Sequence, residues 1–156
     1  MVDDHQVIRE GVRALLDPSD RVRVVEEASR GDEAIRLAQL LVPDVVILDL
    51  ALPDMDGYEA IRRILRTTRS TRVLVLTGHA PERSLVPAME AGASGFVRKA
   101  TAHDDLLPAL RRVVQGELFL DAHCNRVLVR GLERALHARR RLAGLSDRER
   151  EIVRRT

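Results

Sequence analysis

The apolar residues of this chain form two kinds of stretch, and the two kinds alternate over residues 6–115. Short runs rich in apolar residues occupy residues 22–25, 45–48, 72–77 and 95–98. Runs of this length, bounded by turn residues, are typical of strands buried on both faces. Elsewhere apolar residues recur every three or four positions, which indicates helices over residues 6–16, 31–41, 58–66, 81–91 and 101–115. Strands and helices that alternate with short connections predict a doubly wound α/β fold around a parallel sheet.

The pattern changes after residue 117. A short apolar piece over residues 118–120 is followed by an arginine-rich amphipathic stretch over residues 125–142, which predicts a linker helix. Ser146, with Glu149 three positions later, fits the capping box that starts a further helix. The chain is therefore expected to comprise a domain over residues 1–117, a helical linker over 118–144 and the beginning of a second domain over 145–156.

Polar side chains stand at the carboxyl ends of the predicted strands. Asp49, Thr77 and Lys99 each end or follow an apolar run. Asp3 and Asp4 stand near the N-terminus, where a first strand would end. Because the carboxyl ends of parallel strands meet at one edge of a sheet, we expect these side chains to converge there.

The residue types at this edge favour a phosphoryl group as the ligand. Three carboxylates repel one another unless a cation joins them, and ligands that are all oxygen suit Mg²⁺. A hydroxyl and an ammonium beside that ion match a phosphoryl group, whose spread charge needs several cationic and hydrogen-bonding partners. Lys99 is the only lysine among 26 basic residues, and a compact ammonium suits this role.

Composition and charge narrow the class of protein. Cys124 is the only cysteine, so the chain forms no internal disulfide. No apolar run approaches the ~20 residues that span a bilayer, and the N-terminus has no signal-peptide pattern, so a cytoplasmic protein without membrane contact is expected. Residues 1–120 carry a net charge of −3 and residues 121–156 a net charge of +5. The basic tail could lie against phosphates, or it could be a solvated helix face.

The strand-end residues, in this order, resemble the response-regulator receiver family over residues 1 to about 117. The resemblance implies a flavodoxin-like five-stranded sheet of order 2-1-3-4-5. It makes Asp49 the residue that accepts a phosphoryl group from a histidine kinase. It also implies a Mg²⁺ ion held by Asp3, Asp4, Asp49 and the backbone carbonyl of Ala51, with Asp3 acting mainly through water.

The same resemblance assigns roles to residues on the other side of the site. Thr77 matches the switch hydroxyl, Lys99 the phosphate-binding lysine, and Phe96 the aromatic switch position three residues before the lysine. His79 is a candidate modulator of the lifetime of the acyl phosphate, although a surface histidine is the simpler interpretation. Phosphorylation in this family moves the hydroxyl and turns the aromatic residue inward. The chain is therefore expected to be a signalling switch that catalyses nothing beyond its own phosphorylation and dephosphorylation.

Several segments are similar to the NarL/FixJ group of response regulators. They are residues 3–5, 9–11 and 91–96, while residues 145–152 resemble the opening of the LuxR-type DNA-binding domain of that group. This resemblance implies a two-component phosphorelay that controls transcription. No recognition helix follows within these residues, so DNA binding is expected only through an output domain that is incomplete here. A second copy of the chain is a candidate partner.

The first strand departs from the family pattern. The family has several apolar residues before the acidic pair, whereas only Met1 and Val2 precede it here. A short or missing first strand would leave ladder groups unpaired in the middle of the sheet. We expect that the start is truncated relative to a longer product; a rearranged sheet, or one completed by a second chain, is the alternative.

Three other functions compete with the phosphorylation switch. A phosphohydrolase of the haloacid-dehalogenase type also uses an aspartate after a strand, but Ala51 stands where its second acid is expected. Dinucleotide binding lacks its Gly-x-Gly-x-x-Gly motif. A receiver-like protein that binds partners without phosphorylation remains if the short first strand disables the metal site. Asp54 and Asp56 are interpreted as solvated loop acids, and His5, His103, His123 and His137 show no joint metal spacing.

Overall fold

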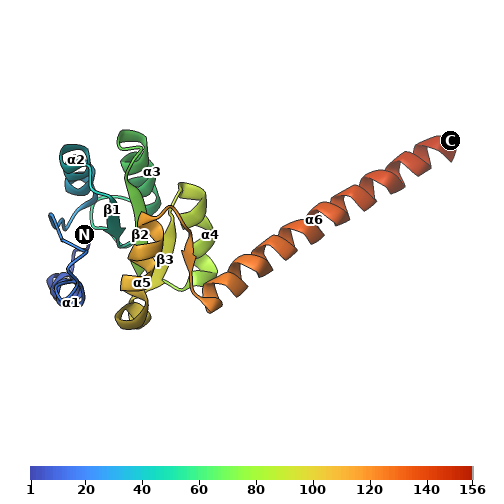
Figure 1. Ribbon diagram of the computed structural model, residues 1–156. Helices are drawn as coiled ribbons and strands as arrows, with labels where there is room; N and C mark the ends of the chain where they lie inside the picture. Colours follow the sequence, from blue (N-terminus) through green and yellow to red (C-terminus); the bar gives the residue numbers. More distant parts are fainter. Residues whose placement is uncertain (156) are drawn as a thin grey trace.

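The protein folds around a parallel sheet with helices on both faces (Figure 1). This computed structural model describes residues 1–155, and the burial of side chains over residues 1–144. The sheet has the order β1-β2-β3-β4, and all of its paired strands are parallel. The strands are β1 (Val45–Leu48), β2 (Arg72–Thr77), β3 (Gly95–Arg98) and β4 (Phe119–Leu120). The predicted parallel α/β fold is confirmed, with the N-terminal part of the sheet reduced.

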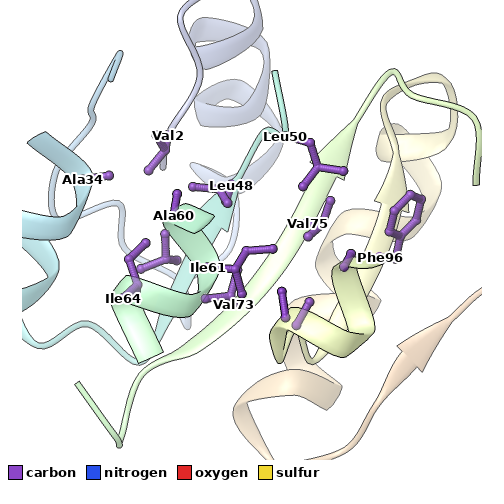
Figure 2. Close-up of a cluster of buried hydrophobic side chains, with 14 of the residues drawn as sticks. Val2, Ala34, Leu48, Leu50, Ala60, Ile61, Ile64, Val73, Val75 and Phe96 are labelled. Atoms are coloured by element: carbon purple, nitrogen blue, oxygen red, sulfur yellow. The ribbon is translucent and has the colours of Figure 1, made fainter. Parts of the chain in front are cut away.

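The helices divide into two layers according to the core that each contacts. They are α1 (Gln6–Leu16), α2 (Gly31–Leu41), α3 (Gly57–Thr67), α4 (Pro81–Ala91), α5 (Ala102–Val114) and α6 (Ala122–Arg155). Residues of α2, α3, α4 and the start of α6 share one core with Val73, Val75 and Phe96 (Figure 2). Residues of α1 and α5 share the second core with Leu74 and Leu76. Because neighbouring strand residues point to opposite faces, the β-branched and leucine residues of β2 serve both cores.

The N-terminal strand of the receiver pattern is reduced to a bridge at Val2. Val2 pairs in parallel with Ala28 on one side and with Leu48 on the other. Its amide donates to the carbonyl of Ile47 at 2.8 Å, and its carbonyl accepts from the amide of Asp49 at 2.9 Å. Ala28, Val2 and Leu48 therefore lie side by side in the order expected for strands two, one and three. The first two strands are reduced to single bridging residues.

The strand predicted over residues 22–25 is wrong. These residues have no strand pairing, and Val22 and Val24 are half-buried against the core of α1 and α5 instead. A strand needs a partner for its backbone groups, and the backbone of residues 1–3 hydrogen-bonds to Glu26 and Ala28 but not to residues 22–25. Residues 22–25 have the composition of a strand but lack a neighbouring strand to pair with.

The C-terminal region differs from the sequence prediction in two ways. Phe119 and Leu120 form a short edge strand, β4, that pairs with Gly95 and Phe96 of β3. The following helix α6 runs from Ala122 to Arg155 without the predicted interruption near residue 145. The capping contact predicted for Ser146 and Glu149 lies outside the described side chains. Among the described residues, no helix combines the length and the apolar character needed to cross a membrane.

Candidate functional site

Asp49 lies directly after β1, at the carboxyl edge of the sheet. It is 2% exposed, because the bridge at Val2 covers one side of it and β2 the other. One carboxylate oxygen, Oδ1, accepts a hydrogen bond from the backbone amide of Ala51 at 3.3 Å. The sharp turn after Asp49 is stabilised by the bridge between Ala51 and Asp56. A buried acid is thereby presented at the start of a loop, where a ligand can reach it.

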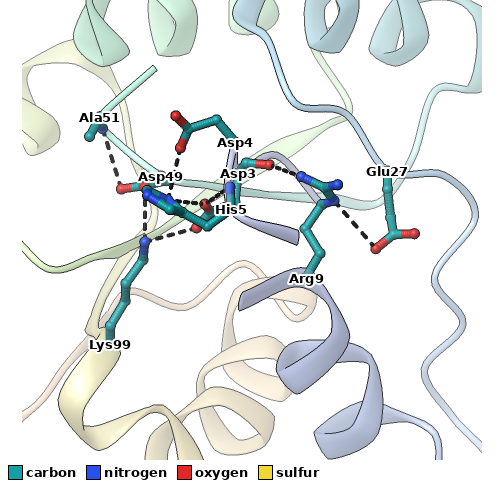
Figure 3. Close-up of polar contacts among 8 residues, drawn as sticks. All are labelled: Asp3, Asp4, His5, Arg9, Glu27, Asp49, Ala51 and Lys99. Atoms are coloured by element: carbon teal, nitrogen blue, oxygen red, sulfur yellow. Dashed lines mark hydrogen bonds and ion pairs between the residues drawn. The ribbon is translucent and has the colours of Figure 1, made fainter. Parts of the chain in front are cut away.

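The N-terminal acids meet Asp49 from the neighbouring bridge (Figure 3). Asp3 is 2% exposed, whereas Asp4 points outward. The amide of His5 donates to Oδ1 of Asp3 at 2.9 Å, and the ring nitrogen Nδ1 of His5 lies 2.9 Å from Oδ1 of Asp4. Asp3, Asp4, His5 and Asp49 each offer one atom that could bind a metal ion, and these atoms all lie within 4.8 Å of one another. The predicted convergence of the acidic pair on Asp49 is present.

His5 is a member of the cluster that the sequence pattern did not single out. Its ring lies against both acids of the N-terminal pair, at 3.1 Å from Asp3 and 2.9 Å from Asp4. Spacing among the five histidines does not reveal it, because a histidine that joins two neighbouring acids needs no second histidine. The signal that could have found it is the adjacency of Asp3-Asp4-His5 at the end of a strand.

Lys99 links the two buried acids. Its ammonium nitrogen lies 2.8 Å from Oδ2 of Asp3 and 2.9 Å from Oδ2 of Asp49. Burial alone would raise the pKa of Asp3, but the ammonium of Lys99 and the amide of His5 together hold this pKa below its usual value. Burial alone would likewise lower the pKa of Lys99, and the two carboxylates raise it instead. Asp3 and Lys99 are therefore both expected to be charged at neutral pH.

Thr77 and Phe96 occupy neighbouring strands beside the acids, and both are fully buried. The hydroxyl of Thr77, at the end of β2, accepts a hydrogen bond from the amide of His79 at 3.1 Å. Phe96 lies in the core that β2 shares with α4. The side chain of His79 is exposed and makes no hydrogen bond or ion pair among the described residues. The structure thus brings Lys99 into direct contact with Asp3 and Asp49, places a carboxylate oxygen of Asp4 within 4.8 Å of both acids, and leaves the His79 side chain without a hydrogen bond or ion pair to this group.

Asp54 and Asp56 cap helices, a role that their interpretation as solvated loop acids did not include; Asp56 is exposed as expected, whereas Asp54 is half-buried. Asp54 accepts hydrogen bonds from the amides of Gly31 at 2.8 Å and Asp32 at 2.9 Å. These amides start α2 and have no partner within the helix. Asp56 accepts from the amide of Tyr58 at 3.0 Å at the start of α3. The loop after Asp49 is therefore fixed to the N-termini of two helices.

The donor set fits a small hard cation. Asp3, Asp4 and Asp49 offer carboxylate oxygens, which are the ligands that Mg²⁺ prefers, and the exposure of Asp4 leaves room for water ligands. The ring of His5 is a softer donor, and it is already within hydrogen-bonding distance of both N-terminal acids. Lys99 balances part of the negative charge, so a cation here would share Asp3 and Asp49 with the ammonium.

Comparison with known proteins agrees with the fold and identifies the family. Residues 1–111 match the family model of the response regulator receiver domain. The chain is 36% identical over 155 residues to the nitrate/nitrite response regulator NarL of Escherichia coli K12, covering 98% of this chain and 71% of NarL. It is 31% identical over 153 residues to the response regulator UvrY of Escherichia coli K12, covering 98% of this chain and 70% of UvrY.

A solved structure supports the same assignment. The crystal structure of a LuxR-family two-component response regulator from Aurantimonas sp. SI85-9A1 superposes with a TM-score of 0.78 at 35% identity, covering 83% of this chain and 93% of that one. Family model, relatives and structure therefore point to the same family. The chain belongs to the response regulator receiver family and is related to the LuxR/NarL-type regulators of two-component systems.

Proposed function

We propose that this chain is a phosphorylation-controlled switch in which Asp49 accepts a phosphoryl group from a partner histidine kinase. The observation that carries the proposal is the position of Lys99, whose ammonium lies 2.8 Å from a carboxylate oxygen of Asp3 and 2.9 Å from one of Asp49. A buried acceptor acid, a second acid and a cation at one sheet edge are the groups that phosphoryl transfer to a carboxylate needs.

The transfer uses one carboxylate oxygen of Asp49 as the nucleophile. That oxygen forms a bond to phosphorus while the bond from phosphorus to the imidazole nitrogen of the phosphohistidine breaks, and the leaving imidazole takes up a proton. Lys99 is placed to neutralise oxygens of the phosphoryl group as they approach Asp49. Thr77 adds a hydroxyl at the end of the neighbouring strand, and the amide of Ala51 steadies the second carboxylate oxygen.

Asp3, Asp4, Asp49 and the backbone carbonyl of Ala51 are the residues that we propose as the Mg²⁺ site. A bound ion would supply positive charge that offsets the charge of the acids and of an incoming phosphoryl group. Asp3 and Asp4 belong in this set because their carboxylates already converge on Asp49. The bridge at Val2 fixes the backbone just before both acids, so the sheet holds this part of the chain in place.

Phosphorylation is proposed to control transcription through the part of the protein that follows the receiver domain. Relatives that share this domain include a nitrate/nitrite response regulator and the response regulator RcsB, a structure of which is described as two dimers bound to two parallel DNAs. Thr77 and Phe96 are the proposed switch residues, and DNA is a proposed partner only through a completed LuxR-type domain. A second copy of the chain is a proposed partner as well.

The test is phosphorylation of the 156-residue chain by acetyl phosphate with Mg²⁺, followed by intact mass. We expect a single added phosphoryl group in the parent and none in Asp49→Ala. The matched control is Asp44→Ala, because Asp44 is an exposed acid just before β1 and its side chain makes no hydrogen bond or ion pair among the described residues. Equal labelling of the parent and Asp49→Ala would sink the proposal. A chelator is expected to abolish the labelling of the parent.

A further inference from the structure

The first turn of α6 is held to the receiver domain by two polar contacts. Asp121, just before the helix, accepts from the guanidinium of Arg98 on β3 at 2.9 Å and caps the amide of Cys124 at 2.7 Å. His123 lies 2.9 Å from a carboxylate oxygen of Glu82, in the first turn of α4. One contact ties α6 to a strand of the sheet and the other ties it to a neighbouring helix.

Each polar contact begins beside a residue of the proposed phosphoryl site. Arg98 directly precedes Lys99, and their backbones meet at the end of β3. Glu82 follows Thr77 by five positions, across a turn whose first hydrogen bond is the one from His79 to the hydroxyl of Thr77. Arg98 and Glu82 are therefore placed to pass a movement of Lys99 or Thr77 on to the start of α6.

An apolar contact lies between the two polar ones. Cys124 is fully buried and belongs to the same core as Phe96, Leu85 and Leu120. Leu120 also pairs directly with Phe96 across the edge of the sheet. A change in the packing of Phe96 therefore reaches the residues that seat the first turn of α6, which protrudes from the body beside α4 (Figure 1).

We propose that Arg98 and Glu82 are positioning residues that couple the phosphorylation of Asp49 to the docking of α6, such that phosphorylation loosens its first turn. This inference rests on the proposed function. The phosphoryl group carries a charge of about −2 in place of the −1 of the free carboxylate, so Lys99 and the Thr77 hydroxyl are drawn towards it and away from their present partners. The connected backbone then strains the contacts with Asp121 and His123, each of which is a partly exposed pair and easily shifted.

Cys124 provides the measurement, because it is the only cysteine of the chain and is buried where the first turn of α6 packs on the core. We would follow the rate at which a maleimide reagent labels this thiol in the 156-residue protein, with and without acetyl phosphate and Mg²⁺. We expect roughly three- to tenfold faster labelling after phosphorylation, because a first turn that is held less firmly opens more often and exposes the thiol to the reagent. Asp49→Asn should label at the slow rate under both conditions.

A variant of the coupling residues separates a positioning role from a purely structural one. Glu82→Gln with Asp121→Asn removes both charges but keeps a capping oxygen at position 121, so we expect fast labelling that no longer responds to acetyl phosphate. The matched control is Glu90→Gln, an exposed acid of α4 without a hydrogen bond or ion pair among the described residues, which should respond as the parent does.

The outcomes of this experiment distinguish the two proposals. Intact mass on the same samples reports phosphorylation independently of thiol labelling. An unchanged or slower labelling rate in a phosphorylated parent overturns the coupling while leaving the phosphoacceptor role intact. A response that persists in the double variant overturns the roles of Glu82 and Arg98. Failure of the parent to be phosphorylated overturns the proposed function, and the coupling with it.

Discussion

The ammonium of Lys99 lies 2.9 Å from a carboxylate oxygen of Asp49, fifty positions earlier in the chain. The same ammonium contacts Asp3, and the side chains of both acids are 3% exposed. Two buried carboxylates thus rely on one cation, which makes the contact a determinant of stability as well as of the proposed chemistry.

Replacing Lys99 should destabilise the protein. We expect Lys99→Met to lower the free energy of unfolding by about 3 kcal/mol, because it leaves Asp3 and Asp49 buried without their partner. Urea unfolding measures the change. Arg13→Met is the control, since it breaks a more exposed ion pair with Glu27 and should cost less than about 1 kcal/mol. Equal midpoints for the two variants would contradict this interpretation.

Mg²⁺ should stabilise the folded protein through Asp4. At ten times its dissociation constant, a ligand that binds only the folded state adds about 1.4 kcal/mol of stability. We expect Mg²⁺ to raise the melting temperature of the parent, and to raise that of Asp4→Asn much less at the same concentration, because one carboxylate of the cluster is lost. Asp20→Asn, at an exposed acid away from the cluster, should behave as the parent does. An identical Mg²⁺ response in Asp4→Asn would remove Asp4 from the metal site.

Two glycines should respond to alanine in opposite directions. A Cβ at Gly57 would lie 2.5 Å from the carbonyl oxygen of Leu50, and this backbone cannot move aside because it immediately follows Asp49. We expect Gly57→Ala to cost about 2 kcal/mol or more through overpacking. Gly11, in the exposed middle of α1, has nothing within 4 Å, so Gly11→Ala should stabilise by about 0.5–1 kcal/mol. Thermal melts of both variants decide the matter, and a stabilised Gly57→Ala would show that the loop tolerates a shift.

The cap at Asp54 should make stability depend on pH. Burial alone would raise the pKa of Asp54, but the amides of Asp32 and Gly31 hold it below its usual value. Because the folded pKa is lowered, the contribution of Asp54 is complete above about pH 4 and is lost as the pH falls through the folded pKa. We expect Asp54→Asn to be roughly 0.3–1 kcal/mol less stable than the parent at pH 7, because Asn lacks the negative charge at the start of α2, with the gap closing below pH 4 or so.

The measurement for Asp54 is the melting temperature of parent and variant over this pH range. Asp20→Asn serves as the control, because Asp20 is exposed and its side chain makes no hydrogen bond or ion pair among the described residues. A gap that stays constant down to pH 3 would show that the carboxylate charge does not matter for the cap.

The strand ends were the most predictable part of the molecule. Asp49, Thr77 and Lys99 follow apolar runs that are buried in the sheet, and local pattern is enough to place such residues at one edge. The helices were placed to within a few residues for the same reason. Local pattern could not show that residues 22–25 lack a partner, because pairing depends on how far the N-terminal segment extends.

The remaining misses involve contacts between segments far apart in the sequence. Asp54 caps a helix that begins 23 positions earlier, and no spacing rule connects the two. Phe119 and Leu120 became a strand because β3 offered a free edge, not because two residues form one alone. Gly144 ends the predicted linker helix, but a glycine costs a helix only about 1 kcal/mol, and α6 continues through it.

The bridge at Val2 fixes which way each N-terminal side chain faces. Val2 is buried in the core of α2 and α3, while the next residue, Asp3, turns to Lys99. Neighbouring residues of an extended segment point to opposite faces, so a one-residue insertion or deletion there would exchange the two environments. A valine would then face the ammonium and a carboxylate would enter the apolar core. The register of residues 1–3 against their neighbours therefore decides whether a charged side chain lies at this edge of the sheet.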